Sequence, residues 1–324
     1  MTLLRPSRRE ILKLAAMAPA FALPVMARAQ LGAPMGQNPA HFRFTLGDAK
    51  LTILSDGYFS VPTTGLGVNA DRAEVADFLQ AHYLSPDAGY SHTNHLLVEL
   101  GAARVLVDVG SGNRWFDTTG RLLANMDAAG VDPSGITHVV ITHAHPDHIW
   151  GIRDDFDEPL FPDAQYVMGA AEHAYWMQDD LVNAVEAADQ QFVLGAVNSI
   201  SVEGVEWVLA HDGFEVAPGI RLIDTPGHTP GHMSLIMESQ GKQLIALGDA
   251  MSHIHTNFEH PEWYNDRDHD GDLTVTTRKR LLDMAVADRI SVLGYHFPFP
   301  GVGHVVRDGG GYRFLPALWQ FPKG

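Results

Sequence analysis

The stretch Thr142-His143-Ala144-His145-Pro146-Asp147-His148 carries the strongest indication of both fold and chemistry in this chain. It follows Val139-Val140-Ile141, a short β-branched run that predicts a strand. A strand that ends in a tight turn would direct the three histidines and the aspartate into one small volume. Imidazole and carboxylate are ligands that zinc and related divalent metals accept. A surface turn explains a lone His-x-His, but four such side chains at this spacing favour a metal site.

Further metal-type residues follow strand-like runs downstream. Thr225-Pro226-Gly227-His228-Thr229-Pro230-Gly231-His232 comes after one such run, Asp249 ends the next, and His296 follows a third. Sites on layered α/β folds are commonly built at strand ends. Taken alone, Asp249 would be an ordinary turn aspartate and His296 a histidine packed among aromatic residues. Their order along the chain, after the histidine-rich stretch, favours metal ligands.

This order of motifs resembles the metallo-β-lactamase superfamily of binuclear metallohydrolases. The matched elements run from Asp108 through HAHPDH and TPGHTPGH to Asp249 and His296. The resemblance implies an α/β fold, a four-layer αββα sandwich in which two sheets lie face to face with helices outside. Hydrophobic periodicity predicts strands near 42–46, 50–55, 94–99, 103–108, 138–142, 165–168, 206–209, 220–224, 233–238, 243–248 and 290–295, and helices near 118–129, 170–196 and 274–288.

Position by position, the resemblance implies two metal sites. The first would be bound by His143, His145 and His228, the second by Asp147, His148 and His296, and Asp249 would bridge both. Asp108 would brace the metal loop, and His232 would support the loop around His228 without binding metal. The other histidines considered (His138, His173, His211, His253, His255, His260 and His269) have no comparable context.

The implied cofactors are two divalent metal ions, zinc first, with manganese, cobalt or iron also acceptable to these ligands. Two metals about 3.5–4 Å apart can share a hydroxide, which then serves as the nucleophile. Asp147 is the catalytic candidate, because its carboxylate could steer that hydroxide or pass a proton to the leaving group.

Within the superfamily, the resemblance is closest to the methyl parathion hydrolase group, relatives of lactonases and arylesterases. It rests on Leu51–Gly57, Gly120–Leu122, Phe299–His304 and Gly311–Phe314. By position, Trp115 and Trp176 match aromatic residues of that group's leaving-group pocket, although both could equally be core residues.

The segment from Met251 to Thr274 departs from that group, so substrate choice could differ there. We predict a hydrolase of esters or lactones, with phosphotriesters as a further substrate class. The alternatives are a β-lactam hydrolase, an iron-dependent oxidoreductase of the sulfur dioxygenase type, and a non-catalytic metal-binding protein.

The N-terminus resembles a twin-arginine export signal. Ser7-Arg8-Arg9-Glu10-Ile11-Leu12-Lys13 precedes an apolar stretch that is too short for a membrane anchor, and Ala27-Arg28-Ala29 offers a cleavage site. We therefore predict a signal peptide at 1–29, a hydrolase domain at 30–324, and export by the twin-arginine machinery to the periplasm. A basic N-terminal helix is the alternative.

The amino-acid composition limits the kinds of metal ligand and binding partner that the chain can have. The chain has no cysteine, which excludes thiolate ligands and disulfides, and its formal charge of −17 disfavours nucleic acid. We expect a small-molecule substrate, and the resemblance implies a homodimer.

The motif Asp266-x-Asp268-x-Asp270-Gly271 resembles the start of a calcium-binding loop, but Thr277 stands where that loop needs glutamate. We interpret it as an acidic loop that caps the following helix, with calcium binding as the alternative.

Overall fold

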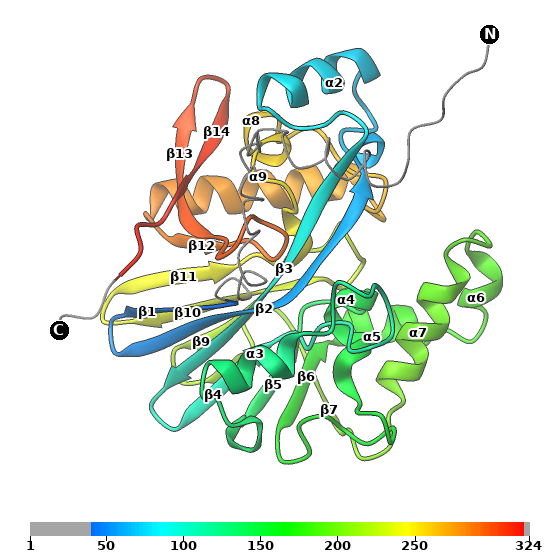
Figure 1. Cartoon of the computed structure of the whole chain (residues 1–324), viewed down its shortest axis with the longest axis vertical. Helices are drawn as coiled ribbons and strands as arrows, with labels where there is room; N and C mark the ends of the chain where they lie inside the picture. Colours follow the sequence, from blue (N-terminus) through cyan, green and yellow to red (C-terminus); the bar gives the residue numbers. More distant parts are fainter. Residues whose placement is uncertain (1–39, 321–324) are drawn as a thin grey trace, which may run out of the picture. The chain divides into compact units, whose positions relative to one another are not determined.

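Two seven-stranded sheets form the framework of residues 40–320, the part of the chain that the structure, a computed structural model, describes (Figure 1). The strands are hydrogen-bonded in chain order in both sheets. The first sheet contains β1 His41–Leu46, β2 Ala49–Pro62, β3 Ala88–Leu100, β4 Ala103–Val107, β5 His138–Ile141, β6 Gln165–Gly169 and β7 Trp207–Ala210. The second contains β8 Glu215–Ala217, β9 Ile220–Asp224, β10 Met233–Ser239, β11 Lys242–Ala246, β12 Ser291–Leu293, β13 Val302–Asp308 and β14 Gly311–Pro316.

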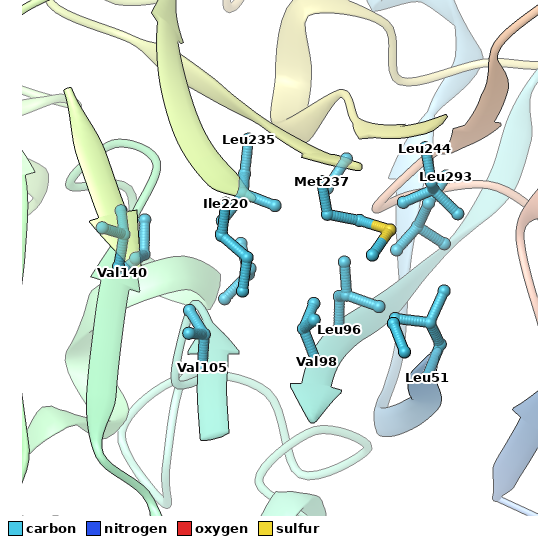
Figure 2. Packing of buried hydrophobic residues seen from close by; sticks show 14 of the residues in the cluster. Leu51, Leu96, Val98, Val105, Val140, Ile220, Leu235, Met237, Leu244 and Leu293 are labelled. Carbon is cyan, nitrogen blue, oxygen red and sulfur yellow. The ribbon is translucent and has the colours of Figure 1, made fainter. Parts of the chain in front are cut away.

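The two sheets pack against each other through a shared apolar core. Leu96 and Val98 of β3 face Leu235 and Met237 of β10 in this core, as Figure 2 shows. Leu97, one residue along β3, points to the opposite face and is also buried. Because side chains alternate along a strand, a strand buried on both faces has an almost continuous apolar sequence.

Helices cover the outer face of each sheet. The first sheet packs on α3, α5 and α7, and the second packs on α9. The helices are α2 Arg72–Ala81, α3 Leu122–Ala128, α4 Pro146–Ile149, α5 Ala170–Trp176, α6 Leu181–Ala184, α7 Gln190–Ile200, α8 Thr256–Glu259 and α9 Gly271–Ala287, with 3₁₀ turns η1 Thr63–Gly65, η2 Pro133–Gly135, η3 Trp150–Ile152 and η4 Gly248–Ala250. The predicted αββα sandwich is thereby confirmed.

The prediction of one helix over 170–196 is wrong. This segment forms three helices, α5, α6 and α7, and Val185 after α6 has extended backbone. The pair Asp179-Asp180 separates α5 from α6, and aspartate side chains compete with a helix for backbone hydrogen bonds. The helix predicted from 118 begins only at Leu122, whose N–H donates to the buried Asp56 at 2.8 Å.

Other predictions were incomplete rather than wrong. The hydrophobic periodicity did not predict α2, α8 or β8. Strands β13 and β14 form a hairpin in a part of the chain for which no strands were predicted. Asp270 caps α9 by accepting from the N–H of Leu273 at 2.9 Å, which confirms the interpretation of the acidic loop as a helix cap.

Strand direction determines where a site can form. β4 and β5 run parallel in the first sheet, and β11 and β12 run parallel in the second. β9 is antiparallel to β10, which is antiparallel to β11, so β9 shares the direction of β11. The carboxyl ends of each group therefore meet at one edge of their sheet.

The predicted export signal lies outside the described residues, as do all positions before 40. Among the helices that the structure describes, none has the length and apolar character needed to cross a membrane.

Candidate metal centre

Residues that follow four strands, β5, β9, β11 and β12, gather into one buried cluster. All seven predicted metal ligands belong to it, in overlapping groups whose donor atoms lie within 4.8 Å of one another. These groups are His143, His145 and His228; His143, His148 and Asp249; and Asp147, His148 and His296. Residues up to 153 positions apart (143 to 296) thus meet because the carboxyl ends of their strands do.

Asp249 lies between the two predicted sites. Its Oδ2 is 3.4 Å from Nε2 of His228 on one side and 3.0 Å from Nε2 of His296 on the other. Its Oδ1 is 3.4 Å from Nε2 of His148. Asp147 contacts only the second group, with Oδ2 at 3.4 Å from Nε2 of His296. A carboxylate in the position of Asp249 can bind two cations at once.

The donor atoms that point into the cluster fit bound metal. Several buried atoms have no hydrogen-bond partner anywhere in residues 40–320, namely His143 Nε2, Asp147 Oδ2, His148 Nε2 and Asp249 Oδ1. Burying polar atoms without partners is unfavourable by about 1–3 kcal/mol each, so such atoms call for an explanation. Cations between them provide one, and the described residues therefore support divalent metal binding.

The opposite ring nitrogens of these histidines are held by hydrogen-bond partners. Nδ1 of His148 lies 2.8 Å from Asp108, Nδ1 of His228 lies 2.9 Å from Asp268, and Nδ1 of His296 lies 2.8 Å from a backbone carbonyl. A carboxylate or carbonyl can only accept, so each Nδ1 carries the proton and leaves Nε2 free. Metal-binding histidines are oriented in this way.

Asp108 braces the histidine-rich loop in a strained conformation. Its Oδ1 accepts from the backbone N–H of Thr142 at 2.8 Å, and its Oδ2 accepts from the Thr142 hydroxyl at 2.9 Å and from His148. Its φ of 59° lies in the left-handed region, which non-glycine residues rarely adopt. Strain of this kind is found mainly where the surrounding structure holds a functional residue in place.

Charges in the cluster shift the pKa of its members in opposite directions. Burial alone would lower the pKa of His148, but Asp147, Asp249 and Asp108 outweigh burial and raise it well above its ordinary value. Burial alone would raise the pKa of Asp249, but His296 and His148 outweigh it and hold the pKa well below the usual range. Burial raises the pKa of Asp147, although both histidines oppose the shift.

His143 and His145 remain neutral bases. Burial is the main reason that their pKa values lie well below the ordinary histidine value, and the neighbouring histidines add to the effect. Neutral imidazole is the form that binds metal.

His232 behaves as a support and not as a candidate ligand. Its Nδ1 lies 2.7 Å from the hydroxyl of Thr225, and its Nε2 accepts from the backbone N–H of Asp249 at 3.0 Å. Burial lowers the pKa of His232 to about 3, so the ring is neutral and can accept from Asp249. Gly248 leaves room for this contact, because a Cβ there would lie 2.5 Å from Nε2 of His232.

Glu172 was missed from the sequence, yet its buried carboxylate joins the two histidine-bearing loops. Oε1 accepts from the backbone N–H of Ala144 at 2.9 Å and from the indole of Trp176 at 2.6 Å. Oε2 accepts from the hydroxyl of Thr229 at 2.6 Å and from the N–H of Gly231 at 3.1 Å. A glutamate on an apolar helix was the only indication that the sequence offered.

Asp268 was also missed in this role. The sequence placed it in an acidic capping loop, but its Oδ1 orients His228, while its other oxygen lies 3.8 Å from the buried guanidinium of Arg278.

The two predicted pocket tryptophans differ in their surroundings. Trp176 is 5% exposed, belongs to the core of the first sheet and lies edge-on to His145, with ring centroids 5.9 Å apart. Trp115 is half-buried against Phe59, whose ring lies edge-on to His296 at 5.7 Å. Phe116 stacks on the same Phe59 ring and is 43% exposed. An apolar wall, which Phe59 links to the metal centre, is thus built from Phe59, Trp115 and Phe116.

The family profile described as "Metallo-beta-lactamase superfamily" matches residues 88–296, most of the described chain and every candidate ligand. The chain belongs to the metallo-beta-lactamase superfamily. Relatives of this superfamily member include an N-acyl homoserine lactonase of Bacillus sp, 25% identical over 197 residues, which are 60% of this chain and 66% of the lactonase. Another is the beta-lactamase-like protein 2 homolog of Caenorhabditis elegans, 33% identical over 163 residues, 49% of this chain and 44% of that protein. The matches therefore span less than two thirds of either relative.

Solved structures of similar fold cover more of this metallo-beta-lactamase superfamily chain. AidC, a dizinc quorum-quenching lactonase solved in complex with a product, aligns with a TM-score of 0.81 at 24% identity over 88% of this chain and 100% of AidC. The hydrolase AbOPH aligns with a TM-score of 0.80 at 25% identity over the same shares. At this identity AidC supports the fold alone.

Proposed function

We propose that the protein is a binuclear, zinc-dependent hydrolase that opens lactones, N-acyl homoserine lactones among them, and cleaves related esters. The observation that carries the proposal is the position of the Asp249 carboxylate between two groups of histidines whose free nitrogens face it. His143, His145 and His228 would hold one ion, Asp147, His148 and His296 the other, and Asp249 both.

The relatives favour lactones among possible substrates. The chain is similar to an N-acyl homoserine lactonase of Bacillus over 60% of its length, and the fold is shared with the dizinc lactonase AidC. Histidine and carboxylate donors with no sulfur ligand suit zinc, and manganese, cobalt or iron would also be accepted. No specific observation favours β-lactam or sulfur dioxygenase chemistry.

Two such ions, when bound, lower the pKa of coordinated water toward about 7 and polarise the carbonyl oxygen of the substrate. The protein supplies the orientation of the groups around them. Asp108 and Asp268 fix the rings of His148 and His228, and Glu172 holds the two loops at a constant separation.

Asp147 is suited to move a proton during the reaction. Its Oδ2 points into the cluster and has no hydrogen-bond partner within residues 40–320. Burial raises its pKa toward the range in which a carboxylate both accepts and releases protons. We propose that Asp147 takes up a proton from the attacking water as the water oxygen bonds to the carbonyl carbon. Asp147 then delivers that proton to the alcohol oxygen released when the acyl C–O bond breaks.

The aromatic wall of Phe59, Trp115 and Phe116 would receive the apolar part of the substrate. An acyl chain or an aryl group would be removed from water against these rings, of which Phe59 lies edge-on to His296. The resemblance of the sequence to the methyl parathion hydrolase group makes phosphotriesters a further candidate substrate class.

A hydrolysis panel tests this proposal. Purified protein loaded with zinc is compared on a long-chain lactone, an aryl ester, a phosphotriester and a β-lactam, with kcat/KM as the readout and Asp249→Asn as the control. We expect the lactone to be preferred and the variant to be nearly inactive on every substrate. Preference for the phosphotriester or the β-lactam, or retained activity in the variant, would contradict the proposal.

We also propose that residues 1–29 direct export by the twin-arginine pathway and that the enzyme works in the periplasm as a homodimer. The motif Ser7–Lys13 supports export to the periplasm, and the family resemblance supports the homodimer. Mass spectrometry of the exported protein tests the signal peptide, since cleavage after Ala29 would leave Gln30 as the first residue.

A further inference from the structure

A second cluster of metal-type side chains lies outside the seven residues of the metal centre. His82 follows α2, while His255 and Glu259 lie at the two ends of α8, and one donor atom of each lies within 4.8 Å of the others. All three residues are half-buried. The i,i+4 spacing places His255 and Glu259 on one face of α8, and the loop after α2 brings His82 against them.

The distances around Glu259 suit a shared cation. Its Oε1 lies 3.0 Å from Nε2 of His82 and 3.1 Å from Nδ1 of His255. Ligands about 2.0–2.1 Å from a tetrahedral zinc are about 3.3 Å apart. The two distances to Glu259 are therefore only slightly shorter than they would be in a loaded site.

Hydrogen bonding limits how the cluster can be satisfied without a cation. Nδ1 of His82 lies 2.8 Å from the backbone carbonyl of Phe78, which can only accept, so this nitrogen carries the proton. In the neutral ring, Nε2 of His82 then presents a lone pair to the Glu259 carboxylate, and two acceptors face each other at 3.0 Å. Either a proton on one of the two groups or a bound cation resolves this conflict, and the cation would also satisfy His255.

The other contacts also match those of a built metal site. The bond from His82 to a backbone carbonyl is the support that metal-binding histidines usually have on their second nitrogen. The start of α8 is fixed by His253, whose Nδ1 accepts from the backbone N–H groups of His255 and Thr256 at 3.3 and 3.1 Å. Asn257 accepts from the N–H of His253 at 2.9 Å.

We propose that His82, His255 and Glu259 form a further metal site, which binds one zinc-class divalent ion and leaves its fourth position to water. Two imidazoles and one carboxylate suit zinc and its transition-metal neighbours, whereas calcium and magnesium prefer sites made of oxygen. The ion joins α2 to the segment that follows Asp249. The same segment continues to Asp268, which orients His228 in the metal centre.

Metal stoichiometry tests this site directly. The protein is saturated with zinc, dialysed against low-micromolar zinc, and its zinc content per chain is measured by mass spectrometry. We expect wild type to hold one ion more than either His82→Ala or Glu259→Gln. Because the difference between proteins is measured, the number of ions at the metal centre does not affect the result.

His260→Ala is the matched control. His260 is adjacent to Glu259, but its ring stacks on Trp263 at 3.8 Å and its Nδ1 faces Glu262. We expect this variant to keep the wild-type zinc content. If His82→Ala fails to fold, Glu259→Gln decides, because it changes one oxygen to nitrogen at constant size. Equal zinc content in wild type and Glu259→Gln would overturn the proposal and leave a hydrogen-bonded His–Glu–His cluster.

Discussion

Replacing Glu172 with glutamine should loosen the metal centre without touching a metal ligand. The carboxylate accepts four hydrogen bonds, two on each oxygen: three come from the loops that carry the candidate ligands, and the fourth comes from the indole of Trp176 on the same helix. Glutamine has almost the same size, but one of its two terminal atoms is a donor. Whichever way the amide is turned, its nitrogen faces two groups that also donate.

The least unfavourable orientation places the amide nitrogen beside Thr229 and Gly231. The Thr229 hydroxyl can rotate and accept, but the N–H of Gly231 cannot and loses its acceptor. A buried donor without a partner is unfavourable by about 1–3 kcal/mol, and bonds to a charged acceptor are worth about 1.5–3 kcal/mol each. Because removal of a buried charge offsets part of the loss, we expect the free energy of unfolding to fall by about 3 kcal/mol.

Urea denaturation of the zinc-free protein measures this change, and a competitive chelator measures zinc affinity in the same variant. Affinity should fall about 10- to 100-fold, as is usual when a group that orients metal ligands is lost. Glu203→Gln is the control, because Glu203 is exposed and the change should stay within about 0.5 kcal/mol. If Glu172→Gln matches Glu203→Gln in both measurements, Glu172 does not hold the loops.

Three other changes probe different parts of the molecule. Asp249→Asn should lower kcat/KM for lactones by about 100-fold or more and reduce bound metal, because the shared carboxylate is lost; near-normal turnover with one ion per chain would rule out a binuclear mechanism. Trp115→Ala should raise KM about 10-fold for a long-chain lactone and less for a short one, since only the long chain reaches the aromatic wall; equal effects would make Trp115 a core residue. Burial raises the pKa of Tyr166 to about 12, so above pH 10 the unfolded chain releases this proton first and wild type loses stability as the pH rises, by about 1.4 kcal/mol at pH 11. Tyr166→Phe should be about 1 kcal/mol less stable than wild type at pH 8, because the 3.1 Å hydrogen bond from the N–H of Phe161 is lost. In denaturation curves this difference in stability should disappear by pH 11. A difference that stays constant with pH would refute the raised pKa of Tyr166.

Local sequence was sufficient to predict most strands, and together with the family resemblance it named every candidate ligand. Strands buried on both faces are nearly continuous apolar runs, as at Val139-Val140-Ile141, and a group of histidines after such a run has few structural explanations. The prediction of a single helix over 170–196 was wrong because the apolar pattern continues across the two positions at which the backbone leaves the helical conformation.

The tertiary structure alone decided how the ligands are supported and what lies beyond them. Glu172 and Asp268 act across 57 and 40 residues, through bonds to Thr229 and His228, and nothing in their local sequence marks those partners. His82 and Glu259 meet across an even longer separation. Periodicity describes which face of an element is apolar, whereas a hydrogen bond between distant loops depends on how the sheets pack. The sequence by itself therefore determined the layers and the donors, and only packing determined how those donors are oriented and held.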